Sequence, residues 1–152
     1  MLVAVRPRIA LAALAFLLAA AVVGVAFASR SRPTSGLVDG RLRPCPTTDN
    51  CVCSQDPGEA HAISPLVVTG DPDEAFARLV GRLDTRYELL SLEDSYAHLE
   101  VTSWLGMRSD LELMLDRDTG LVHVRSASRV GRVDLGANRR RVEALRGELG
   151  AR

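Results

Sequence analysis

The chain has 152 residues with 19 basic and 19 acidic side chains, so its formal net charge is zero. This length suits one domain of ordinary size. Every basic residue is arginine, and the lack of lysine excludes Schiff-base chemistry and a Walker-type phosphate loop. The charge is nevertheless polarised, because residues 1–43 carry +5, residues 44–124 carry −10 and residues 125–152 carry +5. Without lysine and with an acidic middle segment, the chain is not expected to bind nucleic acid.

An uncharged apolar run of twenty residues, Ile9–Ala28, begins close to the N-terminus. As a helix it would be about 30 Å long, which matches the hydrocarbon thickness of a bilayer. The run exceeds the roughly 7–15 apolar residues of a signal peptide, and this favours an uncleaved membrane anchor. The alternative is a signal peptide cleaved after Ala26-Phe27-Ala28, a small-x-small site.

Two signals disagree about the side of the membrane on which the rest of the chain lies. Four arginines follow the apolar run and only two precede it, which favours a cytoplasmic domain: Arg30, Arg32, Arg41 and Arg43 against Arg6 and Arg8. Three clustered cysteines are instead typical of an oxidising compartment. We expect a membrane-anchored chain with its domain on the extracytoplasmic side, or a secreted or periplasmic protein after cleavage near Ala28.

Composition predicts three parts: an anchor or signal peptide over 1–28, a tether and Cys-containing loop over 29–60, and an α+β domain over 61–152. The middle part is rich in Ser, Pro, Gly, Thr and Asp and has no apolar periodicity. Ordered structure is expected from near His61, with a first strand within Ile63–Val68.

Two helices are predicted after this strand. Asp71-Pro72-Asp73-Glu74 is a strong helix start, with an N-cap aspartate, proline at the first helical position and glutamate three residues after the cap. Its buried face comprises Phe76, Leu79, Val80 and Leu83. The second helix is expected from Asp134, as its N-cap, to Leu149. Its apolar stripe comprises Leu135, Val142, Leu145 and Leu149, with Asn138 on the same stripe.

Strands with period-two alternation lie between the helices. They are expected at Tyr87–Glu93, Ala97–Leu105, Leu111–Asp116 and Leu121–Arg129, with a hairpin connection at Arg117–Gly120. The predicted fold is α+β, an antiparallel sheet of about four to five strands with two helices on one face, preceded by an N-terminal transmembrane or signal helix.

The three cysteines allow several states. Cys45 and Cys51 can close a short loop by a disulfide, whereas Cys51 and Cys53 are a poor pair because one residue separates them. With His61, the three cysteines also form a set of four potential zinc ligands, although their spacing matches no established zinc motif. Free thiols are the third alternative. We favour the disulfide and expect neither a metal nor a cofactor.

A catalytic site has only weak support. His98 and Glu100 are predicted on one strand face, where with Arg125 they form the site expected of an uncharacterised enzyme. Such a pair is more often a structural cross-strand contact. We therefore assign no catalytic residue and lean against an enzyme.

The C-terminal segment from Arg125 to Arg141 is the least generic part of the chain. Arg125 and Arg129 are predicted on one strand face, near a helix start whose free amides can bind a phosphate or carboxylate. The fifteen acids of the middle segment favour a different interpretation, in which both arginines pair with Glu100, Asp110 or Glu112 across the sheet. A small anion or a protein is therefore the possible partner, besides the membrane.

Three motifs together resemble the family named domain of unknown function 1499. They are Cys45-Pro46-Thr47-Thr48-Asp49-Asn50-Cys51-Val52-Cys53-Ser54, then His61-x-Ile63-x-Pro65-Leu66, and a C-terminal run from Val124 to Arg141. The resemblance covers about residues 42–150. It implies an envelope or thylakoid-lumen compartment, an N-terminal membrane or targeting segment and no established activity.

Individual positions follow from this resemblance. Cys45 and Cys51 match the family's paired cysteines, and Cys53 stands where serine is common. The family tends to have two adjacent acids ahead of the third strand, where this chain has Ser109-Asp110. The polar residues carried over as a ligand-binding set are Glu100, Asp110, Arg125, Ser126, Ser128, Arg129, Asp134, Asn138, Arg139 and Arg141. The leading hypothesis is a tethered or exported, non-catalytic binding or structural module that uses this Arg-rich motif.

Overall fold

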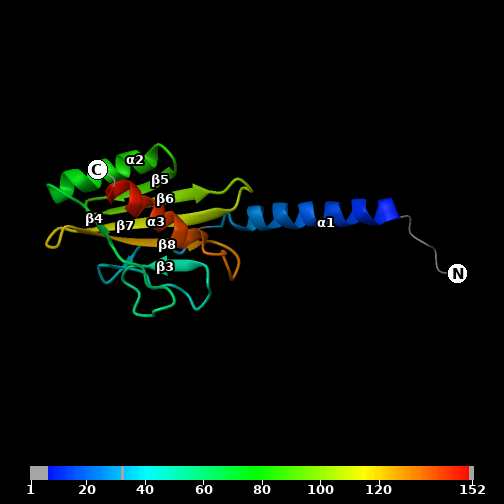
Figure 1. Cartoon of the computed structure of the whole chain (residues 1–152), viewed down its shortest axis with the longest axis horizontal. Helices are drawn as coiled ribbons and strands as arrows, with labels where there is room; N and C mark the ends of the chain where they lie inside the picture. Colours follow the sequence, from blue (N-terminus) through cyan, green and yellow to red (C-terminus); the bar gives the residue numbers. More distant parts are fainter. Residues whose placement is uncertain (1–6, 32, 151–152) are drawn as a thin grey trace.

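A computed structural model describes residues 7–31 and 33–150 of the chain. Arg6 and Arg32, two of the arginines expected to flank the apolar run, lie outside the described residues. Figure 1 shows a long N-terminal helix that leads into one end of an α+β domain. In chain order the elements are α1 (Pro7–Ala28), β1 (Leu37–Val38), β2 (Arg41–Leu42), β3 (Cys51–Cys53), β4 (Leu66–Val67), α2 (Pro72–Asp84), β5 (Glu88–Glu93), β6 (Tyr96–Thr102), β7 (Arg108–Asp116), β8 (Leu121–Ser128) and α3 (Ala137–Gly150).

Helix α1 projects away from the domain, and none of its residues is buried. It is long and apolar enough to cross a membrane, a property that anchors share with signal sequences. The expected helix over Ile9–Ala28 is therefore present.

The sheet is antiparallel, with the order β3-β8-β7-β6-β5. Strands β5 to β8 follow one another as a meander, since short turns join antiparallel neighbours. Strand β4 also pairs with β8, so β3 and β4 share that edge of β8. The sheet thus has six strands, one more than the largest number expected, because the segment before His61 contributes β3.

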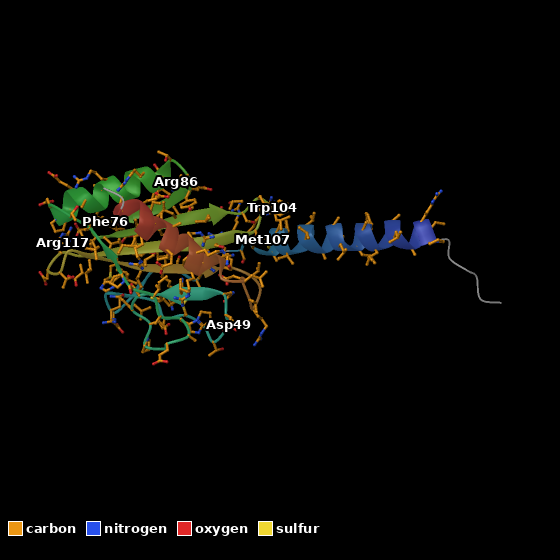
Figure 2. The ribbon with its side chains drawn as sticks, viewed as in Figure 1. Asp49, Phe76, Arg86, Trp104, Met107 and Arg117 are labelled. Atoms are coloured by element: carbon orange, nitrogen blue, oxygen red, sulfur yellow. A yellow bond between two sulfur atoms is a disulfide. The ribbon has the colours of Figure 1, made fainter. Side chains whose placement is uncertain are left out.

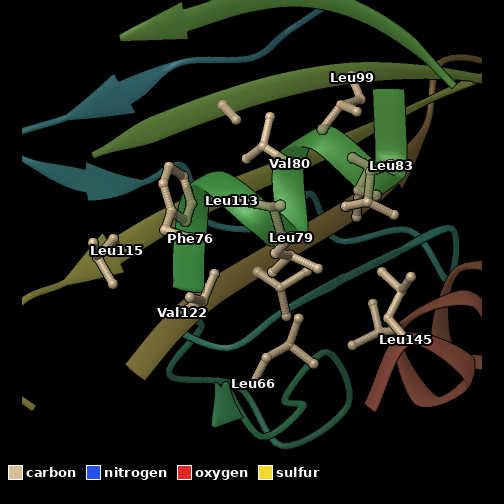
Figure 3. Close-up of a cluster of buried hydrophobic side chains, with 14 of the residues drawn as sticks. Leu66, Phe76, Leu79, Val80, Leu83, Leu99, Leu113, Leu115, Val122 and Leu145 are labelled. Atoms are coloured by element: carbon tan, nitrogen blue, oxygen red, sulfur yellow. The ribbon is translucent and has the colours of Figure 1, made fainter. Parts of the chain in front are cut away.

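Both α2 and α3 pack on one face of this sheet and form the main apolar core with it (Figure 3). Helix α2 begins as its sequence predicts: Asp71 is the N-cap, its side chain accepts a hydrogen bond from the amide of Glu74, and Pro72 is the first helical residue. The face it buries contains Phe76, Leu79, Val80 and Leu83, and α3 contributes Val142 and Leu145.

The opposite face of the sheet is also buried, and this departs from the half-buried strands that the alternation predicts. In β6, His98 and Glu100 alternate with the core residues yet are 5% and 4% exposed. Residues between α1 and β3 cover this face; for example, the amide of Gly36 donates to Glu112 Oε1 at 2.7 Å. Residues 33–60 are therefore part of the folded structure, and the expectation that order begins near His61 is wrong.

Helix α3 begins three residues later than predicted, at Ala137. Asp134 still caps it, because its carboxylate accepts hydrogen bonds from the amides of Gly136 and Asn138, both at 2.8 Å. Leu135 and Gly136 have positive φ and cannot belong to a helix. Leu135, expected in the apolar stripe, is instead 83% exposed.

Candidate functional site

The covered face of the sheet holds a cluster of paired charges. Glu100 on β6 and Asp110 on β7 are direct cross-strand neighbours, an arrangement that repels when both carboxylates are ionised. The guanidinium of Arg129 joins them, with Nη1 at 2.7 Å from Glu100 Oε2 and Nη2 at 2.7 Å from Asp110 Oδ1. Arg108 adds a second contact to Glu100 at 3.1 Å. Arg129 thus bridges the two buried acids, and Arg108 supplies a second positive charge beside Glu100.

A second ion pair lies beside the first. Glu112 and Arg125 are cross-strand neighbours on β7 and β8, and Arg125 Nη1 lies 2.6 Å from Glu112 Oε2. Glu112 is fully buried, and its other oxygen accepts from the hydroxyl of Tyr96 at 2.8 Å and from the amide of Gly36. Burial, first, and then the neighbouring Glu112 raise the pKa of Tyr96, which keeps its hydroxyl a donor. The expected pairing of Arg125 and Arg129 with sheet carboxylates is confirmed.

His98 belongs to the same cluster but not in the expected arrangement. Its Nε2 lies 2.8 Å from Asp110 Oδ1, and its Nδ1 lies 3.4 Å from the hydroxyl of Ser35. A serine, a histidine and an aspartate that contact one another in this order are the groups of a hydrolytic catalytic triad. Here, however, the carboxylate is shared with Arg129, and neither Ser35 nor His98 is among the residues that line the cleft described below. The expected grouping of His98, Glu100 and Arg125 does not form, since each pairs with another residue.

The electrostatics of Asp110 reflect these partners. Burial acts to raise the pKa of its carboxyl, but hydrogen bonds from His98 and Arg129 outweigh burial. The pKa of Asp110 therefore lies below its ordinary value, and the carboxylate is the stable form in the folded protein.

A cleft of about 450 Å³ opens over one side of this cluster. Asp110, Arg125 and Arg129 line it from the sheet side, and residues of the segment between α1 and β3 line it as well. The volume falls within the range of small-molecule sites. Among the residues of that segment are Ser31, Pro33, Thr34, Arg43, Pro44, Cys45, Pro46 and Thr48.

Two arginines that line this cleft have unused hydrogen-bonding capacity. The Nε atoms of Arg43 and Arg125 are buried and have no hydrogen-bond partner. Within residues 7–31 and 33–150, Arg43 also forms no ion pair with a carboxylate, in contrast to Arg125 and Arg129. A buried donor without a partner is costly, so both Nε–H groups favour an acceptor placed within hydrogen-bond distance of them.

The polar residues of the C-terminal motif that face the helices form a separate cluster. The side-chain amide of Asn138 donates to the carbonyl of Asn50 at 2.9 Å and to Ser128 Oγ at 3.0 Å. Its oxygen accepts from Ser126 Oγ at 2.8 Å and from Arg141 Nη1 at 2.6 Å. Asn138 is 1% exposed, so this network fixes α3 to β8 and to the residue before β3.

The remaining residues of the expected ligand set have local roles. Asp134 caps α3, as described above. Arg139 donates to the carbonyls of Ala62 and Ala60, at 2.9 and 3.4 Å. Thus the ten residues do not converge on one site. Four of them line the 450 Å³ cleft: Asp110, Arg125, Ser128 and Arg129.

The cysteines resolve into a disulfide and a thiol. Cys45 and Cys51 are bonded, as expected, and the bond joins a residue that lines the cleft to β3. Cys53 is buried, and burial raises the pKa of its thiol. The zinc alternative needs all four side chains of Cys45, Cys51, Cys53 and His61, and the disulfide occupies two of them. Residues 7–31 and 33–150 contain no group of three or more metal-binding side chains.

Comparison with known protein families identifies the family of this chain. The profile of one family, Protein of unknown function (DUF1499), matches residues 41–149. The chain belongs to this family. The match begins at β2, so this DUF1499 domain includes the disulfide loop and β3 as well as the later sheet and helices. Comparisons with curated proteins and with solved structures give no match.

Several site residues of this DUF1499 domain had no role in the expected set. The sequence indicates Arg43 only as a charge beyond the apolar run, and Asn50 only as part of the cysteine motif. Asn50 is buried and donates to the carbonyl of Gly131 at 2.7 Å. The sequence signal for a role of Asn50 is its position beside Cys51 in the cysteine motif. Nothing in the sequence distinguishes Arg43 from the other arginines.

Proposed function

We propose that this chain is a membrane-anchored binding module, with its domain on the extracytoplasmic side and a cleft that takes a small anion. The observation that carries the binding part is the pair of buried, unpartnered Nε–H groups of Arg43 and Arg125, two residues that line the cleft. Carboxylate and phosphate oxygens are the acceptors that guanidinium groups bind best.

The charges around the cleft support an anion rather than a cation. The cleft and its surroundings hold three carboxylates, of Glu100, Asp110 and Glu112, and each is already paired with arginine. Arg43 adds a positive charge that no described carboxylate neutralises. An anion bound there would satisfy Arg43 without breaking the existing pairs.

Anion binding is tested by titrating the full chain in detergent with inorganic phosphate at constant ionic strength. Calorimetry and thermal shift measure the binding. Arg43→Gln removes the unpaired charge, and we expect phosphate affinity to fall about tenfold or more, as for loss of a hydrogen bond to a charged group. Arg41→Gln is the matched control, because Arg41 is exposed, lies two residues away and does not line the cleft. Equal phosphate binding by both variants, or no binding by the wild type, contradicts the proposal.

The membrane part rests on α1 and on the disulfide, which is typical of oxidising compartments. We expect the uncleaved chain to stay in the membrane fraction after alkaline carbonate extraction. In spheroplasts an added protease is expected to digest the domain. Release of the chain by carbonate contradicts the anchor, and complete protection from protease contradicts the extracytoplasmic placement.

A further inference from the structure

Three large apolar side chains are exposed to solvent at one end of the domain. Trp104 is 92% exposed, Leu135 is 83% exposed and Val133 is 60% exposed. Trp104 belongs to the loop between β6 and β7, and the other two belong to the loop between β8 and α3. Both loops border one cavity, which Ser103 and Met107 line from the first loop and Val133 and Leu135 from the second. Trp104, Val133 and Leu135 thus lie on two loops that border the same cavity, and the three residues are called here the apolar loop surface.

The conformation of Leu135 sets this surface apart from incidental exposure. Its φ is +54°, in the left-handed region that leucine rarely adopts. Glycine or asparagine suits such a position better, and the exposed side chain adds nothing to the core. An exposed leucine in a strained backbone points to a contact outside the domain.

Helix α1 leaves the domain from this same end. The amide of Arg108, just after the β6–β7 loop, donates to the hydroxyl of Ser29 at 3.0 Å. In the same loop, a Cβ at Gly106 would lie 3.7 Å from the Cβ of Ala26. Figure 2 shows Trp104 and Met107 beside the end of α1, with Arg117 at the opposite end of the domain.

Exposed arginines accompany the apolar loop surface. Arg132 precedes Val133, Arg140 donates to the carbonyl of Leu135 at 2.8 Å, and Arg30 lies two residues after the end of α1. The nearby carboxylate of Asp134 is occupied in capping α3. Tryptophan, leucine and arginine together are typical of surfaces that lie at the boundary between lipid and water.

We infer that the apolar loop surface docks on the lipid bilayer, with Trp104, Val133 and Leu135 in the headgroup region and the arginines against anionic lipid. This inference rests on the membrane anchor proposed above, because α1 fixes which end of the domain faces the bilayer. The domain then contacts the membrane at two places, through α1 and through this surface.

The experiment uses Trp104 as its own reporter, since it is the only tryptophan. The full chain is reconstituted into vesicles of phosphatidylcholine and phosphatidylglycerol, with or without bromine on the acyl chains. We expect Trp104 emission to move to shorter wavelength on reconstitution and to lose most of its intensity in brominated vesicles. Leu135→Asn suits the positive φ, so it should keep the fold but reduce the bromine quenching.

The matched control moves the indole to the other end of the domain. Val67, 64% exposed, pairs with Leu121 beside the β7–β8 hairpin. In the double variant with Trp104→Phe and Val67→Trp, brominated lipid should leave the emission unchanged. Equal quenching of both indoles, or no quenching of Trp104, overturns the inference. A blue shift that depends on protein concentration and not on bromine also overturns it, because a second copy then covers the surface.

Flotation of the same vesicles separates this inference from the anchor. If the chain floats after carbonate treatment but Trp104 is not quenched, the anchor holds and the docking surface is wrong. If the chain does not float, the anchor fails and the docking inference fails with it.

Discussion

Glu100 and Asp110 stand directly opposite each other on β6 and β7, and a single guanidinium, that of Arg129, contacts both carboxylates. All three side chains are 4% exposed. Two like charges this close to each other and this far from water are stable only with a shared counter-charge. The stability of the covered face therefore depends on Arg129 more than on any single acid.

The first prediction concerns removal of that charge. Arg129→Met leaves two buried carboxylates with too little compensation, so we expect a loss of about 3–5 kcal/mol of unfolding free energy near pH 7. Urea unfolding followed by circular dichroism measures it. The control is Arg78→Met, which breaks an exposed pair with Glu74 and should cost less than about 1 kcal/mol. Comparable losses in the two variants would mean that the buried pairing contributes no special stability.

The second prediction is the pH dependence. The hydrogen bonds from His98 and Arg129 hold the pKa of Asp110 below its ordinary value despite burial, so the folded protein binds fewer protons than the unfolded chain. This stabilisation is complete above the ordinary aspartate pKa, about 4, and is lost as the pH falls through the lowered value. Unfolding free energy should therefore decrease on acidification below pH 4 in the wild type.

Asp110→Asn should remove part of this decrease, because an amide does not titrate in that range. In Arg129→Met the two facing carboxylates lose the guanidinium that they share, so acidification relieves the repulsion between them and the difference in unfolding free energy from wild type shrinks. A difference that stays constant between pH 7 and pH 4 would contradict the assigned pairing.

The third prediction tests the network around Asn138. Asn138→Ala removes four hydrogen bonds and leaves Arg141 and the carbonyl of Asn50 without this partner. We expect a loss of about 2–3 kcal/mol in chemical unfolding. Ala144→Ser, at an exposed position of the same helix, is the control and should stay close to wild type. A near-neutral Asn138→Ala would mean that water replaces the network at no cost.

The fourth prediction concerns the disulfide. Cys45–Cys51 closes a short loop, so its removal by Cys45→Ser should cost about 2 kcal/mol through the entropy of the unfolded chain. Mass spectrometry after alkylation without reductant should detect no modified cysteine in the folded wild type, since Cys53 is buried with a raised pKa. Alkylation of three cysteines in that sample would show that the disulfide is absent.

The elements that sequence analysis predicts well carry local signals. Asp71-Pro72-Asp73-Glu74 specifies a helix start by capping chemistry alone, and the alternation around Leu99 and Leu113 specifies strands. The covered face was not predictable in this way. Charged residues at alternate strand positions ordinarily face water, and only the distant covering segment, with contacts such as Gly36 to Glu112, makes them interior.

The candidate site shows the same limit. The pairing of Arg125 and Arg129 with acids followed from charge balance and strand register, whereas Arg43 enters the cleft through the path of an irregular segment. The sequence correctly predicts that Asp134 caps the last helix, but it does not predict that the helix begins at Ala137. The reason is that Leu135 and Gly136 adopt positive φ, which for leucine no sequence rule anticipates.

The short distance between α1 and the cleft restricts where the domain can act. Helix α1 ends at Ala28, Ser29 is already held by Arg108, and Ser31 lines the cleft. Three residues extend at most about 10 Å, so a chain anchored by α1 has no spacer that would let the domain diffuse outward. The solutes that reach the cleft are then those in the layer of solution next to the membrane surface.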